Sequence, residues 1–307
     1  MSLHRLASIT LGVPDVATVS RYYEEFGLVG NASGTTFSTT EGGEQLRLAA
    51  APSRRLLEAV IGADDEDDVE RAAAGMTALG CAVRRSPSTA AGREPATGVR
   101  FTVTVRPRLH QSPPAASPVN APGRIERPAA RTPGILREGR VRPRRLGHVV
   151  LGTTAFAATL RFLTEGVGFR VSDLVSDHGA FLRCSTDHHN LLIQQAPVPF
   201  VHHSAWQVED IDEIGRGAMA MLEGHPERHV WGLGRHYAGS NFFWYLRDPA
   251  GTFSEYYSDL DDIGEDALWT PQVLEGARGL FSWGPPPPPS FIHPEDLAGL
   301  MTGSHIH

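Results

Sequence analysis

Hydrophobic and polar positions recur with the same spacing in the two halves of the chain. The segment RLASITLGV (5–13) aligns without gaps on RLGHVVLGT (145–153), 140 residues later, and Arg21 and Tyr22 then match Arg161 and Phe162. Each segment predicts an apolar strand, a polar turn and an amphipathic helix that ends at a glycine, within EEFGL in the first half and TEGVGF in the second. The pattern therefore predicts two copies of one module.

A second repeat lies inside each half. Residues 56–76 and 201–221 each predict a strand, an acidic turn and a helix, and the residues before them predict short strand pairs. Residues 235–258 predict two strands around the turn DPAG, a motif that the end of the first half, GVRFTVTVRPRLHQ, lacks. We expect an α+β protein with a first module over 1–110, a Pro- and Arg-rich connector over 111–144, a second module over 145–258, and a tail with a proline-rich segment over 259–307.

The composition is that of an ordinary globular protein. The 307 residues are 41% hydrophobic and 21% charged, no apolar run is long enough to span a bilayer, and the N-terminus lacks the features of a signal peptide, so we expect a cytoplasmic protein with no membrane partner. The connector is basic but has no interleaved aromatic residues, and the chain carries a net charge of −7, so we expect no nucleic-acid partner. All 28 basic residues are arginine, which excludes chemistry that depends on lysine.

Histidines provide the strongest indication of chemistry, because nine of the 14 fall within residues 148–236. His148 lies in a predicted strand that begins the second module, His203 lies in the strand of its inner repeat, and Glu255 lies in the strand after the DPAG turn. Two imidazoles and one carboxylate suit ferrous iron and leave coordination positions open for substrate and oxygen. His148 matches Ser8 and His203 matches about Glu58. A metal site is therefore predicted in the second module alone.

The chain resembles the type I extradiol ring-cleaving dioxygenases of the vicinal oxygen chelate superfamily, which are built from paired βαβββ modules. The resemblance rests on GHVVL around His148, HHSAW around His203, GRHYAGSNFFWY around His236, and DPAGTFSEYYSD around Glu255. It implies mixed sheets curled into an open barrel, with His148, His203 and Glu255 as ligands of Fe(II). Mn(II) is an alternative metal, since geometry rather than affinity selects among such ions. The implied partners are a catechol substrate and O2, and we expect a homo-oligomer.

The same resemblance implies roles for three further residues. His189 would be the acid–base residue beside the oxygen site, and His236 and Tyr245 would contact the substrate oxygens. Such roles are chemically reasonable, because binding and opening a catechol require proton transfers and histidine titrates in the relevant range. Alternation along a strand would turn His188 away from His189. By the same alternation, His202 would be an outer or solvent-facing neighbour of the ligand His203.

Four further residues are predicted to line the substrate pocket: Val150, Phe181, Trp206 and Phe242. Their apolar side chains favour an aryl- or alkyl-substituted catechol over a carboxylated one. The tail is expected to pack across the module and help to close the site. Two alternatives remain open, namely another metal enzyme of the superfamily (glyoxalase-, epimerase- or hydroxyphenylpyruvate-dioxygenase-like) and a metal-free binding protein that resembles the antibiotic-sequestering members.

Overall fold

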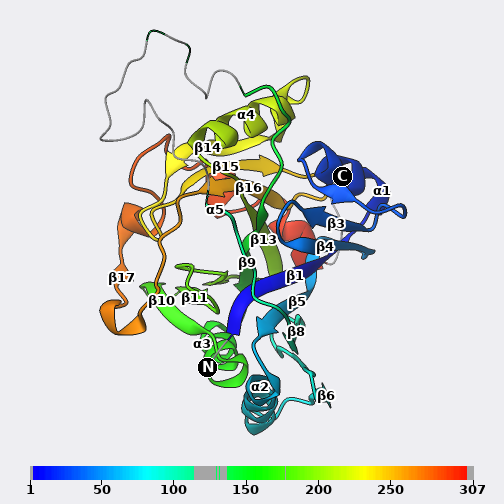
Figure 1. The fold of residues 1–307 in the computed structure, drawn as a ribbon, viewed down its shortest axis with the longest axis vertical. Coiled ribbons are helices and arrows are strands. Elements are labelled where there is room, and N and C mark those ends of the chain that lie inside the picture. Colours follow the sequence, from blue (N-terminus) through cyan, green and yellow to red (C-terminus); the bar gives the residue numbers. More distant parts are fainter. Residues whose placement is uncertain (1–2, 114–128, 130, 132–136, 177, 303–307) are drawn as a thin grey trace.

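The computed structural model describes residues 3–113, 129, 131, 137–176 and 178–302, and the middle of the predicted connector lies outside these residues. The first half contains two successive βαβββ units (Figure 1). The first unit consists of β1 (Leu3–Val13), α1 (Val16–Glu25), β2 (Val29–Gly30), β3 (Thr36–Thr39) and β4 (Gly43–Ala50). The second unit consists of β5 (Arg55–Ala63), α2 (Glu66–Ala78), β6 (Arg84–Ser86), β7 (Thr89–Arg93) and β8 (Arg100–Val105).

The second half repeats this order with short additions. Its first unit consists of β9 (Arg145–Thr153), α3 (Phe156–Arg161), a π-helical turn (Phe162–Val167), β10 (Arg170–Val175), β11 (Gly179–Arg183) and β12 (Leu191–Gln195). Its second unit consists of β13 (Phe200–Gln207), α4 (Ile211–Leu222), a 3₁₀ turn (Pro226–Arg228), β14 (His229–Arg235), β15 (Phe242–Arg247) and β16 (Phe253–Ser258). The tail adds 3₁₀ turns (Asp266–Leu268, Gly276–Gly279), β17 (Val273–Leu274), α5 (Pro289–Ile292) and α6 (Leu297–Thr302).

The strands of the described residues form two mixed sheets with matching internal order. The first sheet runs β2-β3-β4-β1-β5-β8-β7-β6, and the second runs β14-β15-β16-β13-β9-β12-β11-β10-β17. In each sheet the first strands of the two units pair antiparallel at the centre, as β1 with β5 and β9 with β13. In neither sheet does the first strand pair with the last, so neither sheet forms a closed barrel among the described residues. The predicted α+β class and the duplicated module are confirmed, and the division into four segments stays a prediction.

The helices begin where short polar side chains cap them. Asp15, Asp65 and Asp210 each accept a hydrogen bond from a backbone N–H of the first turn, in α1, α2 and α4 respectively. The predicted glycine ends are also present, since Gly27 and Gly168 follow their helices with φ of +102° and +101°. These glycines are 141 residues apart, whereas β1 and β9 align at 140. The π-helical turn before Gly168 accommodates the additional residue.

One hydrophobic cluster runs through both halves of the protein. Helix α1 of the first half packs on strands of the second sheet, where the Phe26 ring stacks on Tyr256 with centroids 3.9 Å apart. In return, the π-helical turn of the second half packs on α2, and Phe162 meets Phe101 with centroids 5.7 Å apart. Each half therefore completes the core of the other, and the first module supports the second even though the predicted chemistry lies in the second.

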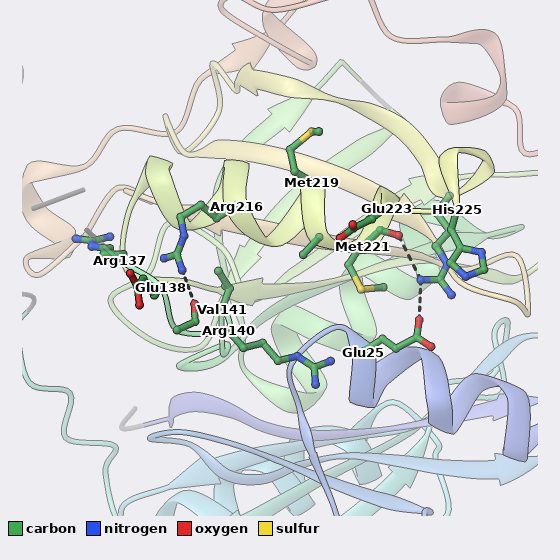
Figure 2. A pocket seen from close by; sticks show the side chains of 13 residues that line it. Glu25, Arg137, Glu138, Arg140, Val141, Arg216, Met219, Met221, Glu223 and His225 are labelled. Carbon is green, nitrogen blue, oxygen red and sulfur yellow. Dashed lines mark hydrogen bonds and ion pairs between the residues drawn. The ribbon is translucent and has the colours of Figure 1, made fainter. Parts of the chain in front are cut away.

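The described end of the connector joins the two halves. Arg137 forms an ion pair with Asp210 at 2.8 Å, and Arg144 pairs with Glu41 at 2.8 Å. Between this segment, α4 and α1 lies a cavity of about 900 Å³ with a charged lining (Figure 2). Arg228 and Glu25 both line it and form an ion pair at 2.7 Å. The described end of the basic connector therefore contacts acidic residues of both halves.

The tail is part of the second module's architecture. Strand β17 pairs parallel with β10 at the edge of the second sheet. Helix α5 lies among the strands that carry the predicted site, and its Phe291 is 6% exposed. In the part of the chain that the structure describes, no helix has the length and apolar character needed to cross a membrane.

Candidate metal centre

Three predicted ligands converge on one point of the second sheet. His148, His203 and Glu255 lie on β9, β13 and β16, which are neighbours in the sheet order. Ala205 of β13 pairs with both His148 and Glu255, and His203 lies two residues before it on the same face. One ligand atom from each of the three residues lies within 4.8 Å of the others. The small side chain of Ala205 leaves the space between the ligands open.

The chemistry of this cluster fits a divalent cation. Glu255 Oε2 lies 3.1 Å from His148 Nε2 and 3.5 Å from His203 Nε2. The Glu255 side chain is fully buried, and Oε2 has no hydrogen-bond donor among the described residues, while Oε1 accepts a hydrogen bond from Asn241 at 3.2 Å. A buried carboxylate oxygen without a donor is costly unless a cation compensates it. Two neutral imidazoles and this carboxylate form the donor set that suits ferrous iron.

His189 lies beside the ligands, with its ring centroid 4.2 Å from that of His148. It is 4% exposed, and burial, followed by the nearby His148 and His188, holds its pKa well below the usual histidine value. His188 and His189 occupy the loop between β11 and β12 rather than a strand. The predicted strand alternation at this pair is therefore wrong. His188 is fully buried and contacts His189, with 3.0 Å between their Nδ1 atoms.

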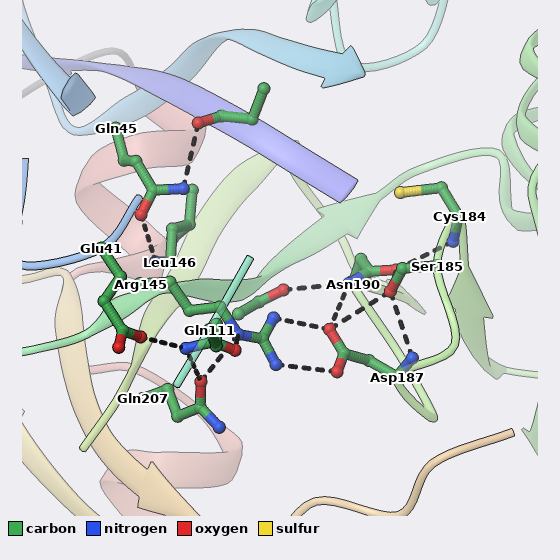
Figure 3. Close-up of polar contacts among 12 residues, drawn as sticks. Glu41, Gln45, Gln111, Arg145, Leu146, Cys184, Ser185, Asp187, Asn190 and Gln207 are labelled. Atoms are coloured by element: carbon green, nitrogen blue, oxygen red, sulfur yellow. Dashed lines mark hydrogen bonds and ion pairs between the residues drawn. The ribbon is translucent and has the colours of Figure 1, made fainter. Parts of the chain in front are cut away.

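Polar side chains hold this loop against β9 (Figure 3). Arg145 donates two hydrogen bonds to the Asp187 carboxylate, at 2.6 and 2.8 Å. Burial opposes the charge of Asp187, but the Arg145 guanidinium outweighs this effect and lowers the pKa of Asp187. Asn190 donates to Asp187 and to the carbonyl of Gly147. The loop that carries His189 is thereby fixed next to the residue before His148.

His236 and Tyr245 form a hydrogen-bonded pair on the other side of the cluster. Their Nε2 and hydroxyl oxygen are 2.8 Å apart, and His236 Nδ1 lies 2.5 Å from the carbonyl oxygen of Leu280. Because a carbonyl only accepts, Nδ1 of His236 donates, so in the neutral ring Nε2 accepts from the Tyr245 hydroxyl. Burial, and next the charge of Glu255, raise the pKa of Tyr245 well above the usual tyrosine value. Tyr245 therefore stays protonated and able to donate.

A cavity of about 660 Å³ opens onto these residues. His148, His203, His189, His236 and Tyr245 all contribute to its wall, and the predicted Val150 and Phe181 line it as well. The remaining wall is largely apolar and includes Leu192, Phe200, Leu274, Phe291 and Ile292. None of the described lining residues is an arginine, aspartate or glutamate. Strands as distant in the sheet order as β11 and β15 share this cavity, which shows that the second sheet is strongly curved.

Two predicted pocket residues lie elsewhere, and their assignment is corrected. Trp206 is fully buried in the core, with its ring centroid 6.4 Å from that of Tyr23. Phe242 packs under the Arg235 guanidinium at 4.6 Å and beside Trp283. Each is three positions from a cavity residue on its own strand, so strand alternation turns it to the opposite face. This alternation could have shown the error from the sequence.

Several site residues were missed by sequence reasoning. The tail contributes Leu274, Leu280 and Phe291, and the carbonyl of Phe291 lies 2.7 Å from His202 Nε2. Burial lowers the pKa of His202 to about 4, and the ring is 4% exposed, so it is an outer neighbour of His203 rather than a solvent-facing one. The tail was expected to help close the site, but its short helices carry no periodic pattern that identifies the residues involved.

Comparison with known proteins agrees with this geometry. Residues 145–256 match the family model described as Glyoxalase/Bleomycin resistance protein/Dioxygenase superfamily. The protein is 31% identical to Metapyrocatechase 2 of Cupriavidus necator, over 95% of this chain and 92% of that protein. The chain therefore belongs to this superfamily and, within it, to the extradiol ring-cleaving dioxygenases.

Solved structures share the fold. Homoprotocatechuate 2,3-dioxygenase from Arthrobacter globiformis superposes with a TM-score of 0.73 and 20% identity, covering 95% of this chain and 91% of that chain. The Mn(II)-bound glyoxalase from Novosphingobium aromaticivorans superposes with a TM-score of 0.70 and 25% identity, covering 92% and 93%. The family resemblance seen in the sequence motifs is thereby confirmed, and the individual site roles remain proposals.

Proposed function

We propose that the protein cleaves the ring of a hydrophobic catechol beside the diol, with O2 as co-substrate and Fe(II) held by His148, His203 and Glu255. The observation that carries this proposal is a buried two-histidine, one-carboxylate cluster that opens into a largely apolar cavity, with no arginine, aspartate or glutamate among its described lining residues. When bound, the iron would supply open coordination positions at which the catechol oxygens and O2 can lie side by side. The product expected is of the hydroxymuconic semialdehyde type.

The protein's own residues would orient the substrate and handle its protons. The Tyr245 hydroxyl and the His236 ring lie next to Glu255, with 3.8 Å between His236 Nε2 and Glu255 Oε1. On substrate binding, the Tyr245 hydroxyl would turn from His236 to a catechol oxygen and stabilise its negative charge, and the lone pair on His236 Nε2 would then be free to accept a catechol proton. His189, on the other side of His148, would accept and return a proton. The buried wall would exclude water, which strengthens these interactions.

The cavity lining favours a neutral substituent on the catechol. An aryl or alkyl group would contact Phe181, Leu192 and Leu274, whereas a carboxylate there would lose its hydration without meeting an arginine among the described lining residues. The relatives carry names for several different catechols, so the preference is proposed from the cavity alone. Manganese(II) is the alternative metal. A homo-oligomeric assembly and a cytoplasmic location stay predictions from the sequence.

The decisive experiment is anaerobic reconstitution with Fe(II), or in parallel Mn(II), followed by addition of a catechol and air. We expect oxygen uptake with a yellow product, and kcat/KM for 2,3-dihydroxybiphenyl and 3-methylcatechol at least about tenfold above that for 3,4-dihydroxyphenylacetate, since burying an unpaired carboxylate costs more than 1.4 kcal/mol. No uptake with any catechol, despite bound metal, would contradict the proposal.

The second candidate is a glyoxalase-type isomerase, favoured by the structural likeness to the Mn(II)-bound glyoxalase. The same reconstituted samples, given the methylglyoxal–glutathione adduct without air, test it directly. Isomerisation of the adduct together with absent oxygen uptake would favour this candidate. A Leu192→Arg variant tests the proposed substrate preference of the dioxygenase. A cation in the cavity wall should shift kcat/KM towards the carboxylated catechol.

A further inference from the structure

His188 is a buried imidazole that neither the ligand cluster nor the cavity wall uses. It is fully buried, and its two ring nitrogens lie between two polar partners. Its Nδ1 is 3.0 Å from Nδ1 of His189, and its Nε2 is 3.0 Å from Oδ2 of Asp173 on β10. Asp173 is itself only 5% exposed. A chain of three polar groups therefore leads from β10 to the cavity.

The positions of the protons in this chain follow from its outer end. A carboxylate accepts hydrogen bonds, so Nε2 of a neutral His188 carries the proton and its Nδ1 is left as an acceptor. The contact between the two Nδ1 atoms then requires that His189 donates, so the proton of His189 is on Nδ1. The lone pair of His189 is consequently on Nε2, the ring nitrogen that does not contact His188.

We propose that Asp173 and His188 are positioning residues for His189: they orient its ring and keep its proton on Nδ1, which leaves Nε2 as the proton acceptor in the cavity. This inference deepens the proposed function and rests on it for the catalytic role of His189. A carboxylate that fixes the tautomer of a catalytic imidazole is an effective catalytic device, because the wrong tautomer has no lone pair where the proton must be accepted.

The neighbouring pair His202 and His203 follows the same rule independently. The carbonyl of Phe291 accepts from Nε2 of His202, and Nδ1 of His202 lies 2.7 Å from Nδ1 of His203. This order places the proton of His203 on Nδ1 and its lone pair on Nε2, the atom that faces Glu255. The tautomer obtained in this way is the one that a metal ligand needs. The second pair is therefore an internal control for the first.

The backbone around Asp173 makes the tautomer testable by one substitution. The second carboxylate oxygen, Oδ1, accepts from the backbone N–H of Gln272 at 2.7 Å. In Asp173→Asn the amide oxygen must stay on Gln272, so the NH₂ group turns to His188 and donates to its Nε2. His188 then carries its proton on Nδ1 and donates to His189. Both rings change tautomer, and Nε2 of His189 becomes protonated.

Two-bond ¹H–¹⁵N correlation of ¹⁵N-histidine-labelled, metal-free protein measures these tautomers directly. We expect His189 with its proton on Nδ1 in the unsubstituted protein and on Nε2 in Asp173→Asn, with His202 and His203 unchanged. After Fe(II) loading, metal content should stay the same while kcat falls at least about 10²-fold, as for other reversed imidazole tautomers and lost outer partners, with KM little changed.

Trp269→Phe is the matched control. The Trp269 ring packs against His188 with centroids 5.3 Å apart, and its Nε1 donates to the carbonyl of Ser172, but it takes no part in the proton order. This variant should keep both tautomers and most of kcat. An unsubstituted protein whose His189 carries its proton on Nε2, or an Asp173→Asn variant with unchanged tautomers, would overturn the proposal. Correct tautomers in a protein that cleaves no catechol would instead contradict only the proposed function.

Discussion

The two modules place different chemistry on the same strand positions. His148 pairs across to Ala205, as Ser8 does to Val60, and Glu255 pairs with Ala205 as Thr102 does with Val60. The three ligands of the second module therefore correspond to Ser8, Glu58 and Thr102 of the first, which agrees with the equivalences expected from the sequence for the two histidines.

The polar groups at the two sets of positions are satisfied differently. In the first module Thr102 Oγ1 donates to Glu58 Oε1 at 2.6 Å, and Arg100 approaches the same oxygen at 3.7 Å. In the second module Glu255 Oε2 has no donor among the described residues. In the first set a neighbouring hydroxyl donates to the carboxylate, whereas in the second set one buried carboxylate oxygen has no donor, which favours a cation. On the proposed assignment, the two modules share one scaffold and differ in metal binding through three side chains.

The largest effect should come from removing a ligand. His203→Ala should abolish stoichiometric Fe(II) binding, since losing a ligand weakens affinity by more than the 10- to 100-fold typical of an outer partner. The equivalent substitution in the first module, Glu58→Ala, should leave metal content unchanged. Metal analysis after anaerobic loading and desalting measures both. Full metal retention in His203→Ala would show that the ligands are misassigned.

The next effect concerns an arginine at the start of each central strand. Arg145 pairs with the partly buried Asp187, whereas the corresponding Arg5 has a buried Nε without a partner among the described residues. Arg145→Ala leaves Asp187 unpaired and should lower the free energy of unfolding by about 3 kcal/mol at pH 7. Arg5→Ala removes an uncompensated buried donor and should be close to neutral. Urea unfolding of the two variants measures the difference.

The pH dependence of the Arg145→Ala deficit has a defined sign. The pKa of Asp187 is lowered in the folded protein, so its pairing with Arg145 stabilises the fold above the unfolded pKa of about 3.9 and is lost as pH falls through the folded pKa. The deficit should therefore be largest at neutral pH and shrink in acid. A deficit that grows in acid would contradict the assignment of Asp187 as the partner.

The contrast between modules also explains what the sequence could predict. The three proposed ligands could be selected from the sequence because each lies in a strand of a duplicated pattern, and alternation along β13 separates His203 from His202. Trp206 was misplaced because the same alternation was not applied to it, although it lies three positions from His203 on β13. The register shifts between β13 and β9, at Val201/His203 and Ala205/Trp206, are set by tertiary contacts and leave no mark on a single segment.

The loops and the tail were harder to predict from the sequence than the strands. His188 lies in a loop whose geometry depends on the ion pair between its neighbour Asp187 and Arg145, which lies on another strand, β9. The wall residue Phe291 belongs to a four-residue helix, too short for any periodicity. The first module has a turn equivalent to DPAG, over Glu94–Gly98, where Glu94 accepts from Thr97. It was missed because the carboxylate is a glutamate and the turn is one residue longer.

These two turns differ in how their carboxylates are held. Asp248 accepts from the N–H groups of Ala250 and Thr252, and burial raises its pKa to about 7. Because the folded protein then binds a proton more tightly than the unfolded one, stability should fall as pH rises from about 4 to 7. Asp248→Asn keeps both hydrogen bonds but removes the titrating group. The fall in the free energy of unfolding between about pH 4 and 7, up to a few kcal/mol, should therefore be much smaller in this variant, as measured by unfolding at a series of pH values.

The matched substitution in the first turn is Glu94→Gln. Both Glu94 oxygens accept hydrogen bonds, since Thr159 donates to Oε1 and Thr97 donates twice to Oε2. With the amide oxygen kept on Thr97, the NH₂ group would face Thr159, whose hydroxyl can turn to Thr153 and accept, so this variant should lose about 1 kcal/mol or less. A slope that persists in Asp248→Asn would assign the pH dependence to another group.

The smallest expected effect directly tests the difference in hydrogen bonding between the Glu255 and Glu58 carboxylates. Without metal, the unpartnered Oε2 of Glu255 is a cost to the folded state, so Glu255→Gln should stabilise the metal-free protein by about 1 kcal/mol while it removes metal binding. Glu58→Gln should give no gain, because Thr102 already satisfies that carboxylate. Thermal unfolding in the presence of a chelator compares the two. If Glu255→Gln destabilised the chelated protein as much as Glu58→Gln does, the second module's carboxylate would be satisfied without a cation, and the central contrast between the modules would fail.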